Sequence, residues 1–293
     1  MSENLVYSQE QLKRLHEKVL SMAEFFVDFC NKNGLTCYFC GGGCIGTIRH
    51  GGFIPWDDDL DFFMPRNDYE KLKKVWNQSH GKGQYVLRYP TKHYNDHNSF
   101  MTLRDVNTTQ IKPYQKDMDI VHGITIDIFP LDGCPSGGFK RKMQLMHAMV
   151  YSLYCSNVIP VKHGKFMRII ATVMLKCVPG QKLKYYIWKY AEKQMSKYPI
   201  DKCEKITELC AGPGPMRFEY PKECFDSAVF RKFENTMMPI PVGYDGYLKI
   251  AFGDYMKLPP ADKQVAHHDC VFMDLENSYK KYKGIYYLID NKK

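Results

Sequence analysis

Four of the five positions from 57 to 61 are aspartates, namely Asp57, Asp58, Asp59 and Asp61. The apolar residues Leu60 and Phe62 within and beside this acidic run indicate that it is partly buried. Buried carboxylates repel one another, which raises their pKa values and destabilises the fold unless a cation neutralises them. Carboxylate oxygens are hard ligands of the kind that Mg²⁺ and Mn²⁺ prefer. The acidic run therefore predicts a divalent-metal site.

The spacing of the aspartates also carries a structural expectation. We expect residues 57–63 to form a strand, and alternation along it would place Asp57, Asp59 and Asp61 on one face. The alternatives are a solvated acidic loop and a calcium loop. Apolar residues inside the run disfavour the first, and Phe62 stands where an EF-hand requires glycine, which disfavours the second.

A further carboxylate, Asp127, lies in the apolar segment 123–129, where Ile126 and Ile128 flank it. A lone aspartate inside such a strand is costly without a partner. Taken alone, a metal ligand and a structural aspartate that caps a nearby turn explain Asp127 equally well. The acidic run favours the metal ligand.

Three consecutive glycines, Gly41, Gly42 and Gly43, follow a predicted strand over residues 36–40 and precede a predicted short helix over residues 44–49. Glycine lets backbone amides approach a phosphate closely, and the N-terminus of a helix favours anions. An ordinary tight turn is the alternative. Arg49, at the end of this segment, could clamp a donor phosphate. The order of glycines and then carboxylates suits a phosphate-transfer site.

Periodic apolar residues predict the elements that position these side chains. Residues 8–32 and 68–76 are expected to be helices, each preceded by a capping pattern. Residues 85–88, 100–104 and 123–129 are expected to be strands. Residues 139–210 have a helical pattern with breaks near Pro160 and Gly180. The predicted fold class is α/β (α+β): a mixed-sheet core over residues 1–138, followed by a largely helical region over residues 139–293.

Composition narrows the class of protein. The chain has 293 residues, of which 44% are apolar, so it can bury a sizeable core. A net charge of +9 suits phosphorylated donors, anionic polymers and membrane surfaces, but no nucleic-acid-binding module is recognisable, so no nucleic-acid partner is expected. The 11 scattered cysteines favour reduced thiols. Residues 1–11 lack the apolar core of a signal peptide, and the longest apolar stretch, residues 169–175, is too short to span a bilayer. We therefore expect a cytoplasmic protein.

The run GGGCIGTIRHGGFIPWDDDLD, over residues 41–61, resembles the LicD family of phosphotransferases. Further similar positions are 64–66, 68–70, 103–105, 107–108, 126–133, 233–234, 240–241, 244, 253–256, 258–260 and 267. The similar positions run from about residue 38 to residue 268 and so extend over most of the chain. Two features depart from the family pattern: Cys44 stands where many relatives have threonine or another small residue, and residues 139–198 match only in character.

The resemblance implies a nucleotidyltransferase-like fold in which Asp59, Asp61 and Asp127 hold Mg²⁺ or Mn²⁺. It implies that Gly41 and Gly42 lie at the donor phosphates. Arg49 and Arg104 are the cations that we expect near phosphate, and Asp127 could also accept the proton of an acceptor hydroxyl. Family members move phosphocholine from CDP-choline, or a polyol phosphate from CDP-ribitol, onto cell-surface glycans.

The resulting expectation is metal-dependent transfer of phosphocholine, or a related phospho-alcohol, from a CDP-linked donor. The acceptor would be a sugar hydroxyl of a surface glycan, such as a teichoic acid or lipopolysaccharide, or of its lipid-linked precursor. Basic residues beside apolar ones in residues 139–198 leave two interpretations open. The favoured one is core helices whose lysines cover a solvated face, and the alternative is a peripheral contact with the inner membrane face. Two alternatives remain open: a glycosyltransferase with an Asp-x-Asp metal site that uses a nucleotide sugar, and a nucleotide-binding module without turnover.

Overall fold

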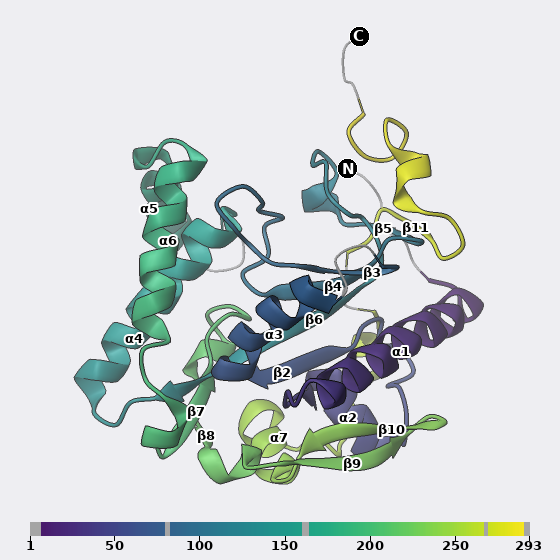
Figure 1. The fold of residues 1–293 in the computed structure, drawn as a ribbon, viewed down its shortest axis with the longest axis horizontal. Coiled ribbons are helices and arrows are strands. Elements are labelled where there is room, and N and C mark those ends of the chain that lie inside the picture. Colours follow the sequence, from purple (N-terminus) through teal and green to yellow (C-terminus); the bar gives the residue numbers. More distant parts are fainter. Residues whose placement is uncertain (1–6, 80–82, 160–163, 267–268, 290–293) are drawn as a thin grey trace. The chain divides into compact units, whose positions relative to one another are not determined.

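The computed structural model describes residues 7–79, 83–159, 164–266 and 269–289, and it confirms the predicted α/β class (Figure 1). Its helices are α1 (Gln9–Lys32), α2 (Gly41–Arg49), α3 (Arg66–Ser79), α4 (Gly138–Ser156), α5 (Gly164–Cys177), α6 (Gln181–Met195) and α7 (Tyr244–Phe252). Its strands are β1 (Tyr38–Cys40), β2 (Asp61–Pro65), β3 (Tyr85–Arg88), β4 (Met101–Asp105), β5 (Thr109–Ile111), β6 (Thr125–Cys134), β7 (Lys205–Glu208), β8 (Tyr220–Pro221), β9 (Ala228–Phe233), β10 (Thr236–Pro241) and β11 (Phe272–Asp274). No helix in the described ranges combines the length and apolar character needed to cross a bilayer.

Local signals set the limits of α1. Ser8 and Gln11 form a reciprocal capping box, with the Gln11 amide 3.1 Å from the Ser8 hydroxyl and the Ser8 amide 2.9 Å from the Gln11 side chain. The helix ends at Asn33, and the following Gly34 has a positive φ of 59°, which glycine adopts without strain. The predicted helix over residues 8–32 is thus confirmed.

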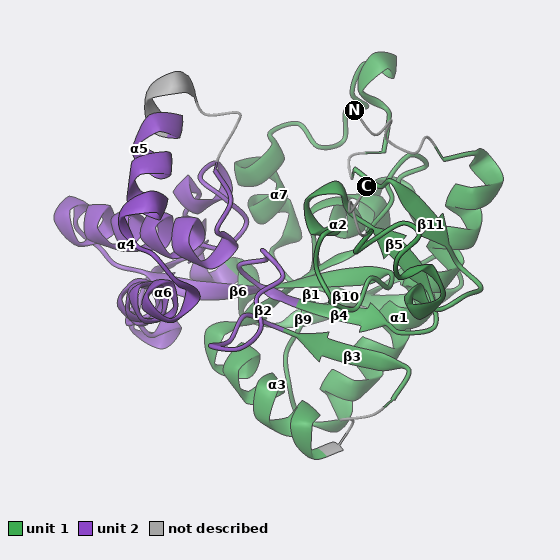
Figure 2. Cartoon of the chain, turned by 90° about the horizontal axis from the view of Figure 1, so that it is seen from above, with its two compact units in different colours: residues 1–88, 102–128, 224–293 green, residues 89–101, 129–223 purple. Residues whose placement is uncertain are grey.

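The chain divides into two compact units, which Figure 2 shows in different colours. The first unit comprises residues 1–88, 102–128 and 224–293. The second comprises residues 89–101 and 129–223. Strand β6 contributes its residues up to Ile128 to the first unit and its residues from Phe129 to the second. The position 138 at which we divided the sequence lies at the start of α4, inside the second unit.

The first unit is built on the strand order β1-β2-β6-β4-β3. Alternation along β2 shows what covers each face: the ring of Phe62 lies 4.9 Å from that of Phe26 in α1, and the ring of Phe63 lies 5.7 Å from that of Tyr247 in α7. Helices α1 and α7 therefore cover opposite faces of the sheet. Because Asp61 is two residues from Phe63, its side chain belongs to the face covered by α7.

Strand β1 depends on segments that come much later in the chain. It pairs with β2 in antiparallel register and contacts β10, which forms a hairpin with β9. The Tyr38 hydroxyl donates to the Phe225 carbonyl at 2.7 Å, and the Phe39 ring lies 5.1 Å from the Phe233 ring. The core of the first unit therefore combines the two ends of the sequence.

A buried arginine organises the second unit. Arg141 of α4 donates to the Gln144 side chain at 2.7 Å, to the Met216 carbonyl at 2.7 Å and to Thr207 of β7 at 3.0 Å. It also forms an ion pair with Glu219 at 3.1 Å. A buried guanidinium needs such partners, because an unpaired charge is costly in the interior.

Two expectations about local structure are wrong. Residues 57–60 are not in a strand, since β2 begins only at Asp61; the shared strand face predicted for Asp57, Asp59 and Asp61 is therefore wrong as well. Residues 205–208 form β7, which pairs with β6, so the helical pattern does not extend to residue 210. The predicted break near Gly180 is confirmed, and the break near Pro160 lies outside the described residues.

Candidate metal and donor site

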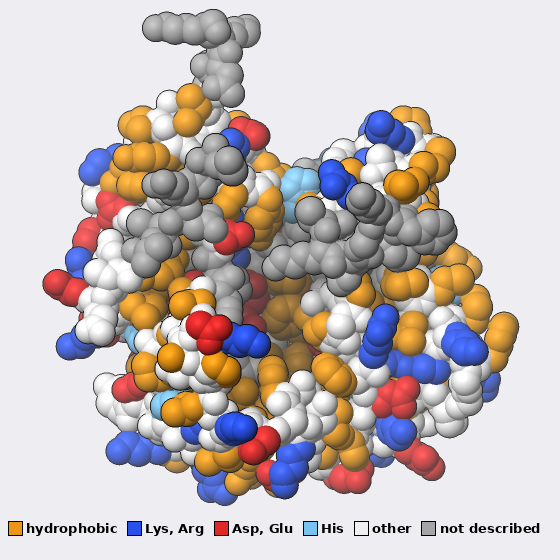
Figure 3. Space-filling model, turned by 180° about the vertical axis from the view of Figure 1, so that it is seen from behind, with side chains coloured by type: hydrophobic (Ala, Val, Ile, Leu, Met, Phe, Trp, Pro, Cys, Tyr) orange, Lys and Arg blue, Asp and Glu red, His pale blue; other side chains and the backbone are white. Residues whose placement is uncertain are grey.

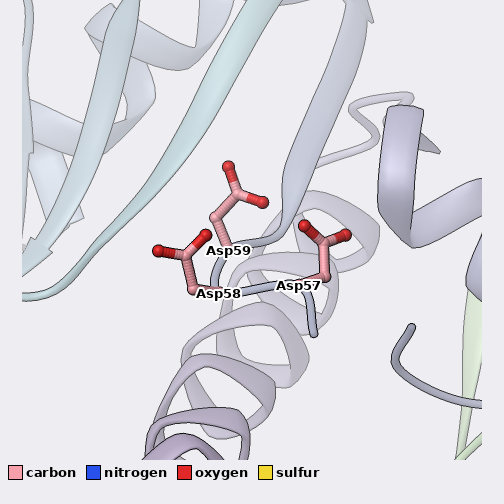
Figure 4. A group of neighbouring side chains, drawn as sticks. All are labelled: Asp57, Asp58 and Asp59. Atoms are coloured by element: carbon pink, nitrogen blue, oxygen red, sulfur yellow. The ribbon is translucent and has the colours of Figure 1, made fainter. Parts of the chain in front are cut away.

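The acidic run forms the loop that leads into β2. Asp57, Asp58 and Asp59 are successive residues of this loop, and each offers a carboxylate oxygen within 4.8 Å of the others (Figure 4). Asp58 is buried, whereas Asp57 and Asp59 are partly exposed. A loop thus gathers these three carboxylates, although the expected strand geometry is absent.

Asp61 and Asp127 add carboxylates from the sheet. Asp61 begins β2, opposite Cys40 in register, and Asp127 lies on β6, the next strand in the sheet order. Burial raises the pKa of Asp61 well above its ordinary value, and the charges of Asp59, Asp127 and Asp57 raise it further. Of the three carboxylates singled out from the sequence, Asp59 and Asp127 therefore both act electrostatically on Asp61.

The donor set fits a hard divalent cation. One side-chain oxygen of Asp61 and one of Asp127, Oδ1 in each case, are buried without a hydrogen-bond partner within the described ranges. An unsatisfied buried carboxylate oxygen is costly, and a bound cation would remove that cost for both. Oxygen ligands from two adjacent strands and the preceding loop are of the type that Mg²⁺ binds.

Lys112 is a cation of this site that the sequence analysis missed. It follows β5 directly, and burial lowers its pKa, but the charges of Tyr114, Asp127 and Asp59 outweigh this effect and leave the pKa raised. Its ammonium therefore lies in the field of the same carboxylates. No motif surrounds Lys112 in the sequence, so nothing beyond the lysine itself indicated this role.

The glycine run opens α2 beside the acidic loop. A β carbon added to Gly42 would lie only 1.9 Å from Oδ2 of Asp57, so glycine is required there by close approach. Gly41 has a positive φ of 51°, and its amide donates to the Tyr247 hydroxyl at 2.9 Å. Cys40, the N-cap residue, makes no capping hydrogen bond with its side chain. Cys40 thus offers no side-chain acceptor to these amides, and the first turn lies next to the Asp57 carboxylate.

Cys44 does not take part in this surface. Its side chain is fully buried, and burial raises the pKa of its thiol to about 12. The departure from the family pattern at this position thus concerns the core of the unit and leaves the first turn of α2 unchanged.

Two long-range contacts hold the acidic loop in place. His16 of α1 donates from Nε2 to the Asp57 carbonyl at 2.6 Å, and its ring stacks on Phe53 with 3.9 Å between centroids. Burial lowers the pKa of His16, although the Asp57 carbonyl opposes the shift. The Glu234 carboxylate accepts from the Phe53 amide at 2.9 Å, and a β carbon on Gly52 would lie 2.0 Å from it. These contacts leave the loop little freedom.

The two arginines expected near phosphate have protein partners. Arg104, which is 2% exposed, donates from Nη1 to the Val121 carbonyl at 2.5 Å and from Nε to Thr102 at 2.9 Å. Arg49 ends α2, at the opposite end from Gly41, and its Nη1 donates to the Tyr255 carbonyl at 2.7 Å. Arg49 thus ties residues 255–257 to α2. His267, another position of the resemblance, lies outside the described residues.

The site combines a carboxylate cluster with a helix that begins at a run of glycines, both on a mixed sheet. It thus defines a class of α/β protein that offers oxygen ligands to a cation and backbone amides to an anion. Comparison with known proteins makes the class more specific. Residues 34–173 match the family model described as LicD/FKTN/FKRP, nucleotidyltransferase domain. The resemblance to the LicD family drawn from the motifs is therefore confirmed, with the family-model domain over residues 34–173.

Individual proteins are also similar to this chain. The chain is 29% identical over 266 residues to the lipopolysaccharide cholinephosphotransferase LicD of Haemophilus influenzae, covering 85% of this chain and 92% of that protein. It is 25% identical over 211 residues to mannosyltransferase regulator 4 of Saccharomyces cerevisiae, covering 66% of this chain but 16% of that protein. Over 88 residues it is 32% identical to an uncharacterized protein of Rickettsia prowazekii, of which it covers 33%.

Proposed function

We propose that this protein transfers phosphocholine from CDP-choline to a sugar hydroxyl of a surface glycan, such as lipopolysaccharide, or of its lipid-linked precursor. The observation that carries the proposal is a pair of buried oxygens, one of Asp61 and one of Asp127, that have no hydrogen-bond partner among the described residues. They lie beside the first turn of α2, which the Cys40 side chain does not cap. The likeness to the Haemophilus influenzae cholinephosphotransferase over 85% of the chain supports the choice of transferred group.

Asp59, Asp61 and Asp127 would hold the cation, which we expect to be Mg²⁺ or Mn²⁺. When bound, the cation would neutralise charge on the donor phosphates, which lowers the barrier to displacement at phosphorus. The fit rests on the two buried oxygens of Asp61 and Asp127 and on the raised pKa of Asp61. Burial and the neighbouring carboxylates raise this pKa, and the charge of Lys112 offsets the rise only in part.

The chain's own groups would divide the remaining work. The first-turn amides at Gly42 and Gly43 would bind donor phosphate oxygens, and Lys112 would add a positive charge. In the transfer, the acceptor hydroxyl oxygen forms a bond to the phosphorus that carries choline, the bond to the CMP oxygen breaks, and CMP leaves. Asp127 would accept the hydroxyl proton. Arg104, being buried, would act only through the residues around it, and Arg49 would position residues 255–257.

The test is a donor screen with label in the transferred group. The protein is incubated with choline-labelled CDP-choline, with CDP-ribitol, CDP-glycerol and CDP-ethanolamine, and with sugar-labelled nucleotide sugars. Each donor is combined with deacylated lipopolysaccharide, with and without Mg²⁺. The proposal predicts label in the saccharide and release of CMP from CDP-choline, only when Mg²⁺ is present.

Other outcomes of this screen identify the alternatives. Incorporation of sugar label would indicate a glycosyltransferase with an Asp-x-Asp site. Saturable CDP-choline binding without CMP release from any combination would indicate a binding module without turnover. Preference for another CDP-alcohol would retain the reaction type and change the transferred group.

A further inference from the structure

The positive charge of the chain is concentrated in one segment. Residues 139–198 contain twelve of the 41 lysines and arginines but only one of the 32 acidic residues, Glu192. Outside this segment the chain has slightly more acidic than basic residues. The net charge of +9 is therefore a property of the segment that forms α4, α5 and α6 in the second unit.

Internal pairing neutralises little of this charge. Glu192 is buried and paired with Lys189, and Arg141 is buried in its own network with Glu219. Most of the other cations in the described part of the segment are exposed, and they are Lys140, Lys142, Arg168, Lys176, Lys182, Lys193 and Lys197. Basic side chains thus cover the surface of these helices without acidic neighbours from the same segment.

Helix α5 also exposes apolar side chains between two of these cations. Ile169 is 60% exposed and Val173 is 53% exposed, and they follow Arg168 and precede Lys176. Residues spaced by four lie on one helix face, so Ile169 and Val173 form a continuous apolar strip. Figure 3 shows hydrophobic and basic side chains, with no acidic ones, on the part of the surface that α5 forms.

The opposite face of α5 belongs to the core of the second unit. Ala171 and Leu175 are buried, α5 contacts α4, and the Tyr154 hydroxyl of α4 donates to the Met174 carbonyl at 3.0 Å. The helix is therefore anchored on one side, and the strip of Ile169 and Val173 faces outward beside Arg168 and Lys176.

We propose that α5 and the basic surface of α4 and α6 bind an anionic lipid bilayer, with Ile169 and Val173 in the headgroup layer. The charge favours an anionic partner, and the aliphatic strip favours one with an apolar interior. A nucleic acid would be favoured by aromatic stacking platforms on this helix, and none of the described exposed side chains of α5 is aromatic. The inference goes beyond the proposed transfer reaction, because binding to lipid can be measured without any donor or acceptor.

The experiment is flotation with vesicles of phosphatidylcholine alone and of equal parts phosphatidylcholine and phosphatidylglycerol, using the full chain. We expect binding only to the anionic vesicles at about 0.01 M salt, and weaker binding at about 0.15 M, where the Debye length falls from about 30 Å to about 8 Å. The test variant combines Arg168→Glu, Lys176→Glu and Lys182→Glu. Because each cation near such a surface contributes about fivefold to partitioning, its partition constant should fall by at least 100-fold, roughly.

A matched control separates local from overall charge. The combination Lys13→Glu, Lys263→Glu and Lys280→Glu changes the net charge equally, at exposed positions of the first unit, and should alter binding by less than about threefold. A second variant, Ile169→Ser with Val173→Ser, keeps the charge and should weaken binding about tenfold, since it removes aliphatic area. Circular dichroism would confirm that each variant is folded.

Three outcomes would overturn the proposal. These are no binding to anionic vesicles at low salt, equal losses for the two triple variants, and a wild-type affinity for heparin that matches vesicle binding while the serine variant loses nothing. The last result would assign the surface to a soluble polyanion. None of them bears on the donor screen, so the two proposals can fail separately.

Discussion

Gly42 and Asp57 approach so closely that a methyl group on Gly42 would overlap the Asp57 carboxylate, at 1.9 Å from Oδ2. This contact joins the first turn of α2 to the acidic loop. The register of β1 with β2 places Cys40 opposite Asp61 and brings the same two segments together from the sheet side. The first turn of α2 and the carboxylates are thus held in a fixed position relative to each other.

The contact predicts that Gly42→Ala impairs catalysis by displacing Asp57. Forcing in a methyl group costs about 1–3 kcal/mol, and a displacement near 1 Å at a reacting centre lowers turnover by about 100-fold. Rates of CMP release would be compared with those of Gly138→Ala, where an added β carbon meets nothing within 4 Å. Combining Gly42→Ala with Asp57→Ala should lose less than the sum of the single effects. Strict additivity would mean that the contact has no role.

Asp59→Asn and Asp61→Asn should each abolish turnover without unfolding the protein. Each change removes an anionic ligand from the candidate cation site, and each also relieves repulsion within the cluster. In the presence of a chelator we therefore expect the melting temperature of Asp61→Asn to equal or exceed that of the wild type. Asp262→Asn, at an exposed position of the same unit, is the control. Full activity of either variant at limiting Mg²⁺ would contradict the assignment.

Asp127→Ala should uncouple the protein from divalent metal. A ligand that binds only the folded state raises the melting temperature, and loss of a ligating residue removes that rise. We expect Mg²⁺ to stabilise the wild type and to leave Asp127→Ala unchanged in a thermal melt, with activity lost. A Mg²⁺-dependent shift equal to that of the wild type would make Asp127 a structural residue.

Arg49 gives a prediction about the segment after α7. Its two carbonyl contacts, to Tyr255 at 2.7 Å and Lys257 at 3.3 Å, should protect residues 253–258 from hydrogen exchange. Arg49→Met should raise their exchange about tenfold, since hydrogen bonds from a charged group contribute about 1.5–3 kcal/mol. Arg231→Met, at an exposed position on β9, should leave this exchange unchanged. If Arg49 instead clamps the donor, as the sequence suggested, Arg49→Met would raise the KM for the donor with exchange unaffected.

The stability of the fold around β11 should depend on pH in the acid range through Asp274. Burial alone would raise its pKa, but hydrogen bonds from the Tyr282 hydroxyl, the Glu276 backbone amide and Asn277 lower it to about 2. A carboxyl group with a lowered folded-state pKa stabilises the fold above its unfolded value of about 3.9, and this contribution is lost as pH falls towards 2.

Urea unfolding of the wild type and of Asp274→Asn at several pH values tests this prediction. The difference in free energy between the two proteins should be constant above about pH 5 and should shrink between about pH 4 and pH 2. A difference that does not depend on pH across this range would show that the Asp274 charge does not stabilise the pairing of β11 with β5.

Sequence patterns were reliable where the determinants are local. Neighbouring residues decide such elements, so the sequence was sufficient to predict them. Examples are α1, from the capping box of Ser8 and the apolar spacing, and β3, from the high β-propensity of residues 85–88. The predicted strand over residues 57–63 was wrong in its first half, because long-range contacts hold the loop there. His16 bonds to Asp57 and Glu234 bonds to the preceding Phe53, across 41 and 181 residues of sequence. No periodicity encodes such contacts.

The carboxylates of the candidate site were identifiable for a different reason. An aspartate among isoleucines and an acidic run among phenylalanines are both costly, so their chemistry shows in the sequence alone. Lys112 was missed because a lysine in a loop is ordinary until the fold places it near Asp59 and Asp127. Arg104 is the opposite case. It was expected near phosphate, but it donates hydrogen bonds to Thr102 and Val121 inside the first unit.

The dependence of β1 on the end of the chain has a consequence for synthesis on the ribosome. The hydrogen bond from Tyr38 can form only after Phe225 has been synthesised, 187 residues later. Synthesis of that stretch takes roughly 10–40 s at about 5–20 residues per second. By that time every residue of the second unit has been made, since that unit ends at position 223. The first unit, whose synthesis begins first, is therefore completed last. Until then, apolar side chains of its strands, such as Phe39 in β1 and Phe62 in β2, are the surfaces that a nascent-chain chaperone would need to cover.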